Sequence, residues 1–352
     1  MSENAQDTQK WLDAQINAAG KLVTIGGKAL RQGRTSQGAE VLTEAEAILD
    51  MAEIESDRLQ KMRARVFNEL GVVYQRRNQL KQSRDYHGRA ADICDELIAK
   101  GDDFAANSAA THLNLSSIHL ALGDRDEARS SGEKALELLA RIDRQELDEE
   151  SPRKGPDPLE LGARQNLAVI YAREENWSKA NEMMEEASRL VDDLADAGRP
   201  DFLAQLAQGC QQLSVLLFEN ERYDDAFRWG TKAEKLSERA YENLGQRVLP
   251  VYIISQINLI SYNEKLGRFA DGEDCLWKAL DVAGNDPRVL QRGVAFYETC
   301  RKQADVRLEK GNLPREEVQA GYAELMERVE AAGGIKAVHE KAKQTRQRRR
   351  ER

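Results

Sequence analysis

The chain has 352 residues, of which 32% are charged and only 6% are aromatic. This balance favours long surface-exposed helices over a β-sandwich or a β-barrel, and the length is sufficient for one large domain or two ordinary ones. The formal net charge is −9, but residues 336–352 carry a net +6 and leave −15 for residues 1–335. Because phosphate binding needs clustered positive charge, the acidic body is not expected to bind nucleic acid along its length.

The expected compartment follows from three further features. No run of about 18 apolar residues exists, so no membrane-spanning helix and no membrane partner are expected. The N-terminal segment MSENAQDTQKW lacks the basic start and the apolar centre of a signal peptide. The four Cys residues are scattered, without a CxxC pair, which is typical of buried thiols in a reducing compartment. These features predict a cytoplasmic protein.

Small residues recur along the chain in three columns that keep the same register, with consecutive members 44 to 52 residues apart. Where two helices cross closely, a large side chain would push the axes apart, so Gly, Ala or Ser is needed there. The pattern therefore predicts a pair of helices repeated seven times. The columns are Ala45, Ala90, Ala135, Ala187, Ala233, Ala279 and Ala323; Gly38, Ser83, Ala128, Ala180, Ala226, Gly272 and Glu316; and Gly26, Gly71, Ser116, Ala168, Ser214, Ile260 and Ala304.

In chain order, an N-terminal extension over residues 1–9 is followed by repeats over about residues 10–330. A basic tail over residues 333–352 comes after the last repeat. The segment 148–158, DEESPRKGPDP, combines Pro, Gly and charge and is predicted to be an exposed loop between two repeats. The predicted helix–turn–helix units lie near residues 10–53, 54–100, 101–145, 159–198, 201–245, 249–284 and 288–332.

The turns inside the units have the expected residues. A left-handed residue is favoured after the last turn of a helix, and Gly adopts it most easily. Asp124 is expected to cap the helix that follows its turn. The glycines that follow a helical run in this way are Gly33, Gly123, Gly267 and Gly311.

The stretches NLSSIHLALGDRDEARSSGEKALEL and NLAVIYAREENWSKANEMMEEASRL resemble tetratricopeptide (TPR) units, with Asn-Leu-small, a turn and two small positions in the second helix. The period of about 45 residues exceeds the 34 of a standard unit, and the extra residues lengthen each helix by roughly 8 Å. Such long units are similar to those of the kinesin-light-chain type. The resemblance implies an all-α fold, a TPR-like α–α superhelix whose concave channel is lined by the first helix of each unit.

In TPR proteins an Asn just before the Leu of the first helix commonly binds the backbone of an extended peptide. An amide offers both a donor and an acceptor, which suits a peptide backbone of any sequence. The alternative is that these amides only satisfy groups of neighbouring helices. The matching residues here are Asn114, Asn166 and Asn258, with Gln212 as a near equivalent; other expected channel residues are Asn68, Gln75, Arg76, Gln165, Arg173, Gln208 and Gln211.

The resemblance implies a non-enzymatic scaffold or adaptor that binds a protein or peptide, with no cofactor, catalytic residue or metal site. Two alternatives stay open. One is a regulatory TPR protein that senses a short peptide. The other is a factor that contacts nucleic acid or an acidic partner only through the basic tail. The tail residues concerned are Lys341, Lys343, Arg346, Arg348, Arg349 and Arg350.

Overall fold

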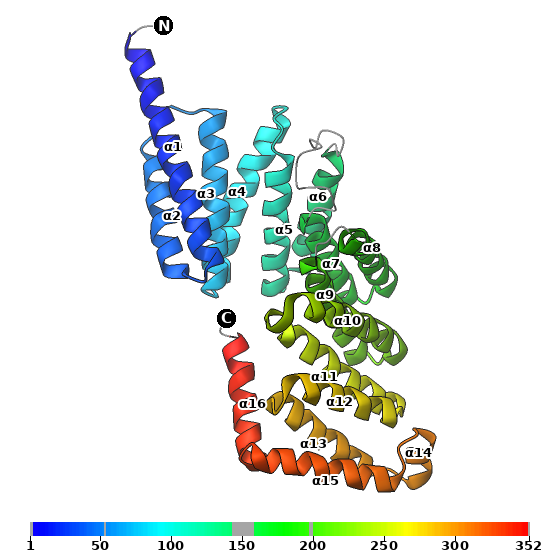
Figure 1. The fold of residues 1–352 in the computed structure, drawn as a ribbon. Helices are drawn as coiled ribbons and strands as arrows, with labels where there is room; N and C mark the ends of the chain where they lie inside the picture. The colour runs from blue at the N-terminus through cyan, green and yellow to red at the C-terminus, as the bar shows by residue number, and fades with distance from the viewer. Residues whose placement is uncertain (1–2, 53, 143–157, 197–199, 351–352) are drawn as a thin grey trace. The chain divides into compact units, whose positions relative to one another are not determined.

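The computed structural model describes residues 3–52, 54–142, 158–196 and 200–350. The described part of the chain is all-α, with sixteen α-helices, one 3-10 turn and no strand (Figure 1). It divides into two compact units, Met1–Ile170 and Tyr171–Arg352, which are described separately. Among the described helices, none is both long and apolar enough to cross a membrane.

In unit 1, consecutive helices pack as antiparallel pairs, α1 with α2, α3 with α4, and α5 with α6 (Figure 1). The first helices also contact one another, α1 with α3 and α3 with α5. The bounds are α1 (Glu3–Arg31), α2 (Thr35–Asp50), α3 (Asp57–Arg76), α4 (Leu80–Ala99), α5 (Ala105–Leu122), α6 (Arg125–Arg141) and α7 (Pro158–Arg173), whose last three residues belong to unit 2.

In unit 2, α9 packs with α10, α11 with α12, and α13 with α15. The last helix, α16, packs on both α13 and α15. The bounds are α8 (Trp177–Asp196), α9 (Asp201–Glu219), α10 (Tyr223–Leu244), η2 (Gly245–Arg247), α11 (Leu249–Leu266), α12 (Phe269–Ala283), α13 (Pro287–Arg301), α14 (Asp305–Lys310), α15 (Arg315–Ala331) and α16 (Gly334–Arg350).

The small-residue columns lie at helix crossings, as predicted, in the first six repeats. The hydroxyl of Ser83 donates to the carbonyl of Gly71 at 2.8 Å, a contact that only small residues allow between two helices. A Cβ added to Gly26 would lie 2.7 Å from Cγ of Leu42. Six alanines of the first column are completely buried: Ala45, Ala90, Ala135, Ala187, Ala233 and Ala279.

The seventh repeat departs from this register. Ala323, Glu316 and Ala304, its members of the three columns, are all exposed. Ala304 lies beyond the end of α13, at the N-cap of α14, a short helix between α13 and α15. Leu308 of α14 and Leu313 in the turn after it are completely buried. A fixed spacing therefore does not find the crossing in this repeat.

The turns confirm three of the four predicted glycines. Positive φ angles occur at Gly33 (76°), Gly123 (92°) and Gly267 (74°). The prediction for Gly311 was wrong, because its φ is −88° and the next residue, Asn312, adopts a φ of 56° instead. Gly311 is needed for a different reason, since a Cβ there would lie 2.5 Å from the carbonyl oxygen of Gly267.

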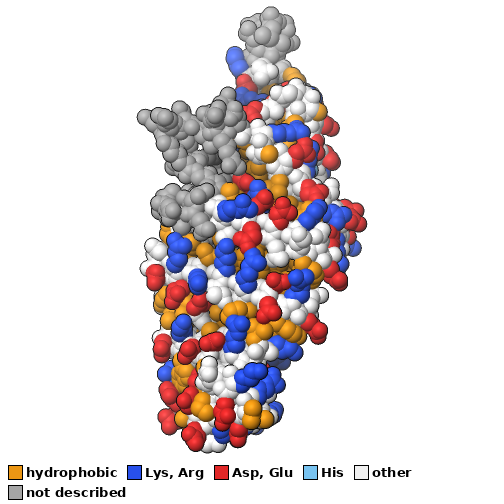
Figure 2. Space-filling view, turned by 90° about the vertical axis from the view of Figure 1, so that its right-hand side faces the viewer, with side chains coloured by type: hydrophobic (Ala, Val, Ile, Leu, Met, Phe, Trp, Pro, Cys, Tyr) orange, Lys and Arg blue, Asp and Glu red, His pale blue; other side chains and the backbone are white. Residues whose placement is uncertain are grey.

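Two other local predictions have clear outcomes. Asp124 stands at the N-cap of α6 but makes no capping hydrogen bond, and its carboxylate lies 3.5 Å from Nδ1 of His119 instead. The predicted loop 148–158 lies outside the described residues except for Pro158, which begins α7. On the face that Figure 2 presents, cationic and anionic side chains are interspersed, as on an ordinary solvated surface.

Candidate peptide-binding site

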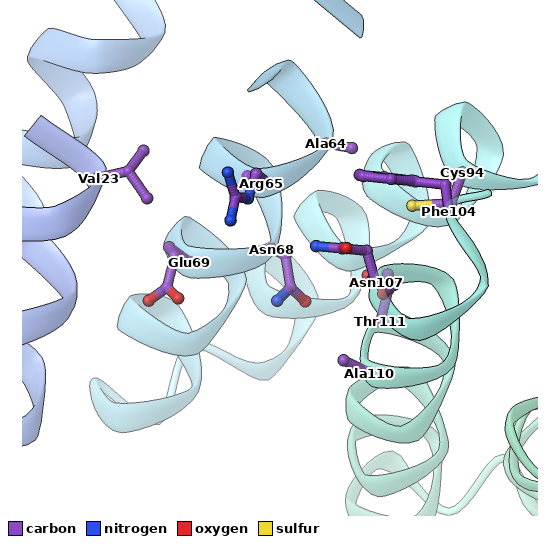
Figure 3. Close-up of a pocket in the computed structure, with 10 residues that line it drawn as sticks. All are labelled: Val23, Ala64, Arg65, Asn68, Glu69, Cys94, Phe104, Asn107, Ala110 and Thr111. Atoms are coloured by element: carbon purple, nitrogen blue, oxygen red, sulfur yellow. Dashed lines mark hydrogen bonds between the residues drawn. The ribbon is translucent and has the colours of Figure 1, made fainter. Parts of the chain in front are cut away.

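A pocket of about 200 Å³ opens between α3 and α5 in unit 1, beside α1 (Figure 3). Its walls combine apolar side chains with the amides of Asn68 and Asn107 and the charged groups of Arg65 and Glu69. Such a mixture is typical of a site that binds a peptide or a small polar ligand. The lining residues are Val23, Ala64, Arg65, Asn68, Glu69, Cys94, Phe104, Asn107, Ala110 and Thr111.

The amide of Asn68 is held in one orientation. Nδ2 of Asn114 donates to Oδ1 of Asn68 at 3.0 Å, and Nδ1 of His87 lies 3.0 Å from the same oxygen. Because two donors share Oδ1, the Nδ2 group of Asn68 is the part of the amide that stays available as a donor. Asn68 and Asn114, both expected channel residues, thus contact each other directly.

His87 is completely buried on α4, and its ring lies against Gly71 of α3. Burial lowers the pKa of His87 to about 4, so the imidazole is neutral at physiological pH. A neutral imidazole has one N–H, and the oxygen of Asn68 places that proton on Nδ1. No hydrogen-bond partner of Nε2 is present among the described residues.

Glu69 occupies the register position that Asn114 and Asn166 hold in later repeats. Burial raises the pKa of its carboxyl, while the positive charges of Arg31, Arg76 and Arg65 act in the opposite direction. Within the described part of the chain, its carboxylate makes no hydrogen bond or ion pair at contact distance. Glu69 therefore presents an acceptor to the pocket beside the donor of Asn68.

A second pocket of about 640 Å³ lies between α1 and α3 and shares Arg65 and Phe104 with the first. Its lining includes four cationic residues and no Asp or Glu. Two of the cations are paired with acids outside the lining, Arg58 with Asp13 at 2.7 Å and Lys61 with Asp102 at 2.6 Å. We call this pocket the basic groove, defined by Ile16, Asn17, Gly20, Lys21, Thr24, Arg58, Lys61, Met62, Arg65 and Phe104.

Other predicted channel residues of unit 1 have different surroundings. Nδ2 of Asn166 donates to the hydroxyl of Ser117 on α5 at 2.7 Å, which links two first helices. Gln165 is only 8% exposed, which leaves little of its side chain accessible to a ligand. Gln75 is exposed, whereas the exposed Arg76 donates to the backbone carbonyl of Leu30 at the end of α1. Arg173, at the end of α7 and already part of unit 2, is exposed.

In unit 2, the predicted channel residues Gln208 and Gln212 are exposed one turn apart on α9. Gln211 corrects the prediction, because it is only 8% exposed and its Nε2 donates to the carbonyl of Val251 and the hydroxyl of Ser255, both at 2.7 Å. It joins α9 to α11 and is not accessible to a peptide. Asn258 is partly exposed, but its Nδ2 is buried and has no partner among the described residues.

Unit 2 also has a pocket of about 380 Å³ formed by α9, α11, α13 and α14. At its wall, Nε of Arg292 donates to the hydroxyl of Ser261 at 3.1 Å, and the same guanidinium pairs with Glu264. Because Arg292 already has two partners, its guanidinium is engaged within the protein.

The basic tail folds as α16. Val338 and Ala342 are buried, and Nζ of Lys341 donates to the carbonyl of Ala332 at 3.1 Å. Lys343 is exposed. The side chains of the remaining predicted tail residues lie outside the described part: Arg346, Arg348, Arg349 and Arg350.

Reasoning from the sequence missed most of the pocket. Asn107 lies two turns before Asn114 on α5, and Arg65 lies one turn before Asn68 on α3. Helical spacing from the predicted amides could have found both. Lys21 and Arg58 gave no such signal, because neither lies within a turn of a predicted amide.

Comparison with solved structures shows the TPR fold. The chain is similar to the signal-transduction ATPase with a tetratricopeptide repeat sensor from Pyrococcus horikoshii (TM-score 0.56, 14% identity, 90% of this chain and 45% of that chain). It is also similar to the apo form of RapI (TM-score 0.51, 15% identity, 89% and 99%). A third similar structure is aspartyl phosphate phosphatase F from Bacillus subtilis (0.50, 14%, 92% and 73%).

These identities are low, so the likeness concerns the fold. No curated protein matches the sequence. A family model matches residues 9–330, which covers nearly all of both units. The chain belongs to this family, which is described as a family of unknown function (DUF6483) and has a TPR-like fold.

Proposed function

We propose that the protein is a non-enzymatic cytoplasmic scaffold that binds a peptide segment of another protein along its first helices. The observation that carries the proposal is the fixed amide of Asn68 beside the unpaired carboxylate of Glu69 in one pocket. A peptide backbone presents carbonyl oxygens and N–H groups in alternation, and the pocket offers one donor and one acceptor to match them.

The surroundings of these two groups support binding rather than catalysis. Burial raises the pKa of the neighbouring Cys94 thiol to about 12, so it stays protonated and is a weak nucleophile. The neutral His87 is buried behind Asn68 and orients it instead of facing the pocket. The tetratricopeptide part of the Pyrococcus horikoshii ATPase is described as a sensor, which agrees with a ligand-binding surface on this fold.

The test uses the full-length chain and a display library of random peptides. Enriched peptides are measured by fluorescence anisotropy on two variants that obstruct the first helices, Gln75→Trp on α3 and Gln212→Trp on α9. Both positions are exposed and Gln75 lies two turns after Asn68 on the same face. We expect at least one of the two variants to lose affinity by about ten-fold or more.

Matched controls place Trp at exposed positions of second helices, Glu96→Trp on α4 and Arg239→Trp on α10. These variants should bind the enriched peptides as the unmodified chain does. Melting curves check that all four variants fold. The proposal is wrong if no peptide is enriched, or if binding is lost on the control variants and kept on the first-helix variants.

A further inference from the structure

We infer that the basic groove of unit 1 binds an acidic peptide segment that carries apolar side chains. The inference rests on the proposed function and specifies the chemistry of the partner. It depends on three properties of the groove: its unbalanced positive charge, its apolar floor, and the hydrogen-bonding groups of the adjoining pocket.

The positive charge is neutralised only in part, because the carboxylate of Glu69 in the adjoining pocket acts on Arg65 without an ion pair at contact distance. Asp13 and Asp102 pair with Arg58 and Lys61, but Lys21 and Arg65 are exposed and have no ion pair within the described residues. Arg65 stands where the groove meets the first pocket, so its guanidinium is accessible from both. A carboxylate that binds here can form ion pairs with Lys21 and Arg65 without breaking an existing ion pair.

The floor of the groove is apolar. Ile16 is 2% exposed and Phe104 is 8% exposed, and Met62 lies between the two helices. A Cβ added to Gly20 would lie 3.2 Å from the terminal methyl of Met62, so Gly20 gives α1 and α3 the close approach that forms this floor. A hollow of about 640 Å³ accommodates a few side chains, and Met is a side chain that adapts to varied apolar partners.

A peptide fits this groove better than a nucleic acid does. Residues 1–335 carry a net charge of −15, which repels a long polyphosphate more strongly than a short peptide with a few carboxylates. The two unpaired cations are few and stand above an apolar floor, which suits carboxylates placed around a Leu or Phe side chain. The adjoining donor of Asn68 and acceptor of Glu69 match the alternating groups of an extended backbone.

The experiment measures fluorescence anisotropy of a short labelled peptide in which Asp and Glu alternate with Leu, on the full-length chain. The comparison probes are the same peptide with Lys in place of every acid, the same peptide with Ser in place of every Leu, and a labelled single-stranded oligonucleotide. We expect saturable binding of the acidic peptide alone, weakened about ten-fold or more by the double substitution Lys21→Glu and Arg65→Glu.

A matched control reverses two exposed cations on α10, Lys235→Glu and Arg239→Glu, and should bind the acidic peptide like the unmodified chain. The inference is overturned if Lys21→Glu/Arg65→Glu leaves binding unchanged, if the Lys or Ser peptide binds equally well, or if only the oligonucleotide binds. If library peptides bind and are blocked by Gln212→Trp while the acidic peptide does not bind, the scaffold function stands and only this inference fails.

Discussion

Asn114 donates from Nδ2 to Oδ1 of Asn68 over 3.0 Å, and this bond connects the first helices of two consecutive repeats. The same oxygen lies 3.0 Å from Nδ1 of His87 on the second helix α4. One amide thus joins three helices while it lines a pocket. Asn68 thus has a structural role in addition to the binding role proposed for it, and stability measurements can distinguish it from the exposed amides nearby.

Asn68→Ala should destabilise the protein by about 1–3 kcal/mol, because it leaves two donors without their acceptor in a partly buried place. Gln75→Ala, two turns further along α3, removes an exposed amide and should change the free energy of unfolding by less than about 0.5 kcal/mol. Urea unfolding followed by circular dichroism measures both. Equal effects of the two substitutions would show that the shared oxygen of Asn68 contributes nothing to stability.

The lowered pKa of His87 makes stability depend on pH in a defined direction. The folded pKa is about 4 and the ordinary value is 6.5, so the unfolded chain takes up the proton first as the pH falls. The contribution of the neutral His87 to the free energy of unfolding is complete above pH 6.5. It is lost progressively as the pH falls towards 4, by about 3 kcal/mol in all. The half-buried carboxyls of Glu69 and Glu273 have raised pKa values and act in the opposite direction.

The measurement is therefore a difference between two proteins. Unfolding free energies of the unmodified chain and of His87→Leu are compared from pH 7 to pH 4. The carboxyls titrate in both proteins and cancel, so the unmodified chain should lose stability more steeply over this range. Parallel pH profiles would contradict the assignment of a neutral buried imidazole.

Replacement of Gly by Ala is expected to change the stability of the protein in opposite directions at Gly71 on α3 and at Gly88 on α4. A Cβ at Gly71 would lie 2.5 to 2.7 Å from three ring atoms of His87, whereas a Cβ at Gly88 would meet nothing within 4 Å. Gly71→Ala should therefore destabilise by about 1–3 kcal/mol through overpacking. Gly88→Ala should stabilise by about 0.5–1 kcal/mol, because Ala restricts the unfolded chain more than Gly does. Thermal unfolding of both variants measures the two effects. A Gly71→Ala variant that is more stable than the unmodified chain would contradict the close helix crossing at this position.

The small-residue columns made the repeats predictable from the sequence, because a close helix crossing excludes large side chains wherever it occurs. Ser83 and Gly71 illustrate the rule, since their hydroxyl–carbonyl contact requires that both are small. The prediction fails in the seventh repeat because it assumes a nearly constant number of residues between equivalent positions of consecutive repeats. The close crossing is found instead at Gly293 of α13, where an added Cβ would lie 2.8 Å from Leu276 and 3.0 Å from Leu325.

The candidate site was less predictable, for a physical reason. Lys21, Arg65 and Phe104 come from three segments about 40 residues apart, and only the packing of α1, α3 and α5 brings them around shared pockets. The sequence also could not show whether an amide points outward or inward. Gln211 and Gln212 are neighbours of the same type, yet one bonds α11 in the interior and the other is exposed.

The basic C-terminal helix allows a last prediction, which also concerns the alternative nucleic-acid role. Val338 and Ala342 of α16 are buried in unit 2, so removal of residues 334–352 should lower the free energy of unfolding by about 2 kcal/mol or more. The double substitution Lys336→Glu and Lys343→Glu changes only exposed charge on α16 and should leave stability within about 0.5 kcal/mol. Chemical denaturation of the three proteins is the measurement, and an equally stable truncated chain would contradict a structural role of α16.

The truncated chain and the double variant together also test nucleic-acid binding, and they distinguish a loss of binding from a loss of folding. Loss of oligonucleotide binding in the truncated chain alone could follow from damage to unit 2, because α16 packs on α13 and α15. Loss in Lys336→Glu/Lys343→Glu, with normal stability and a steep salt dependence in the unmodified chain, would instead assign a phosphate-binding role to α16. We expect no such loss, because Lys341 already donates to the carbonyl of Ala332 and the preceding chain carries a strong negative charge that opposes polyanion binding.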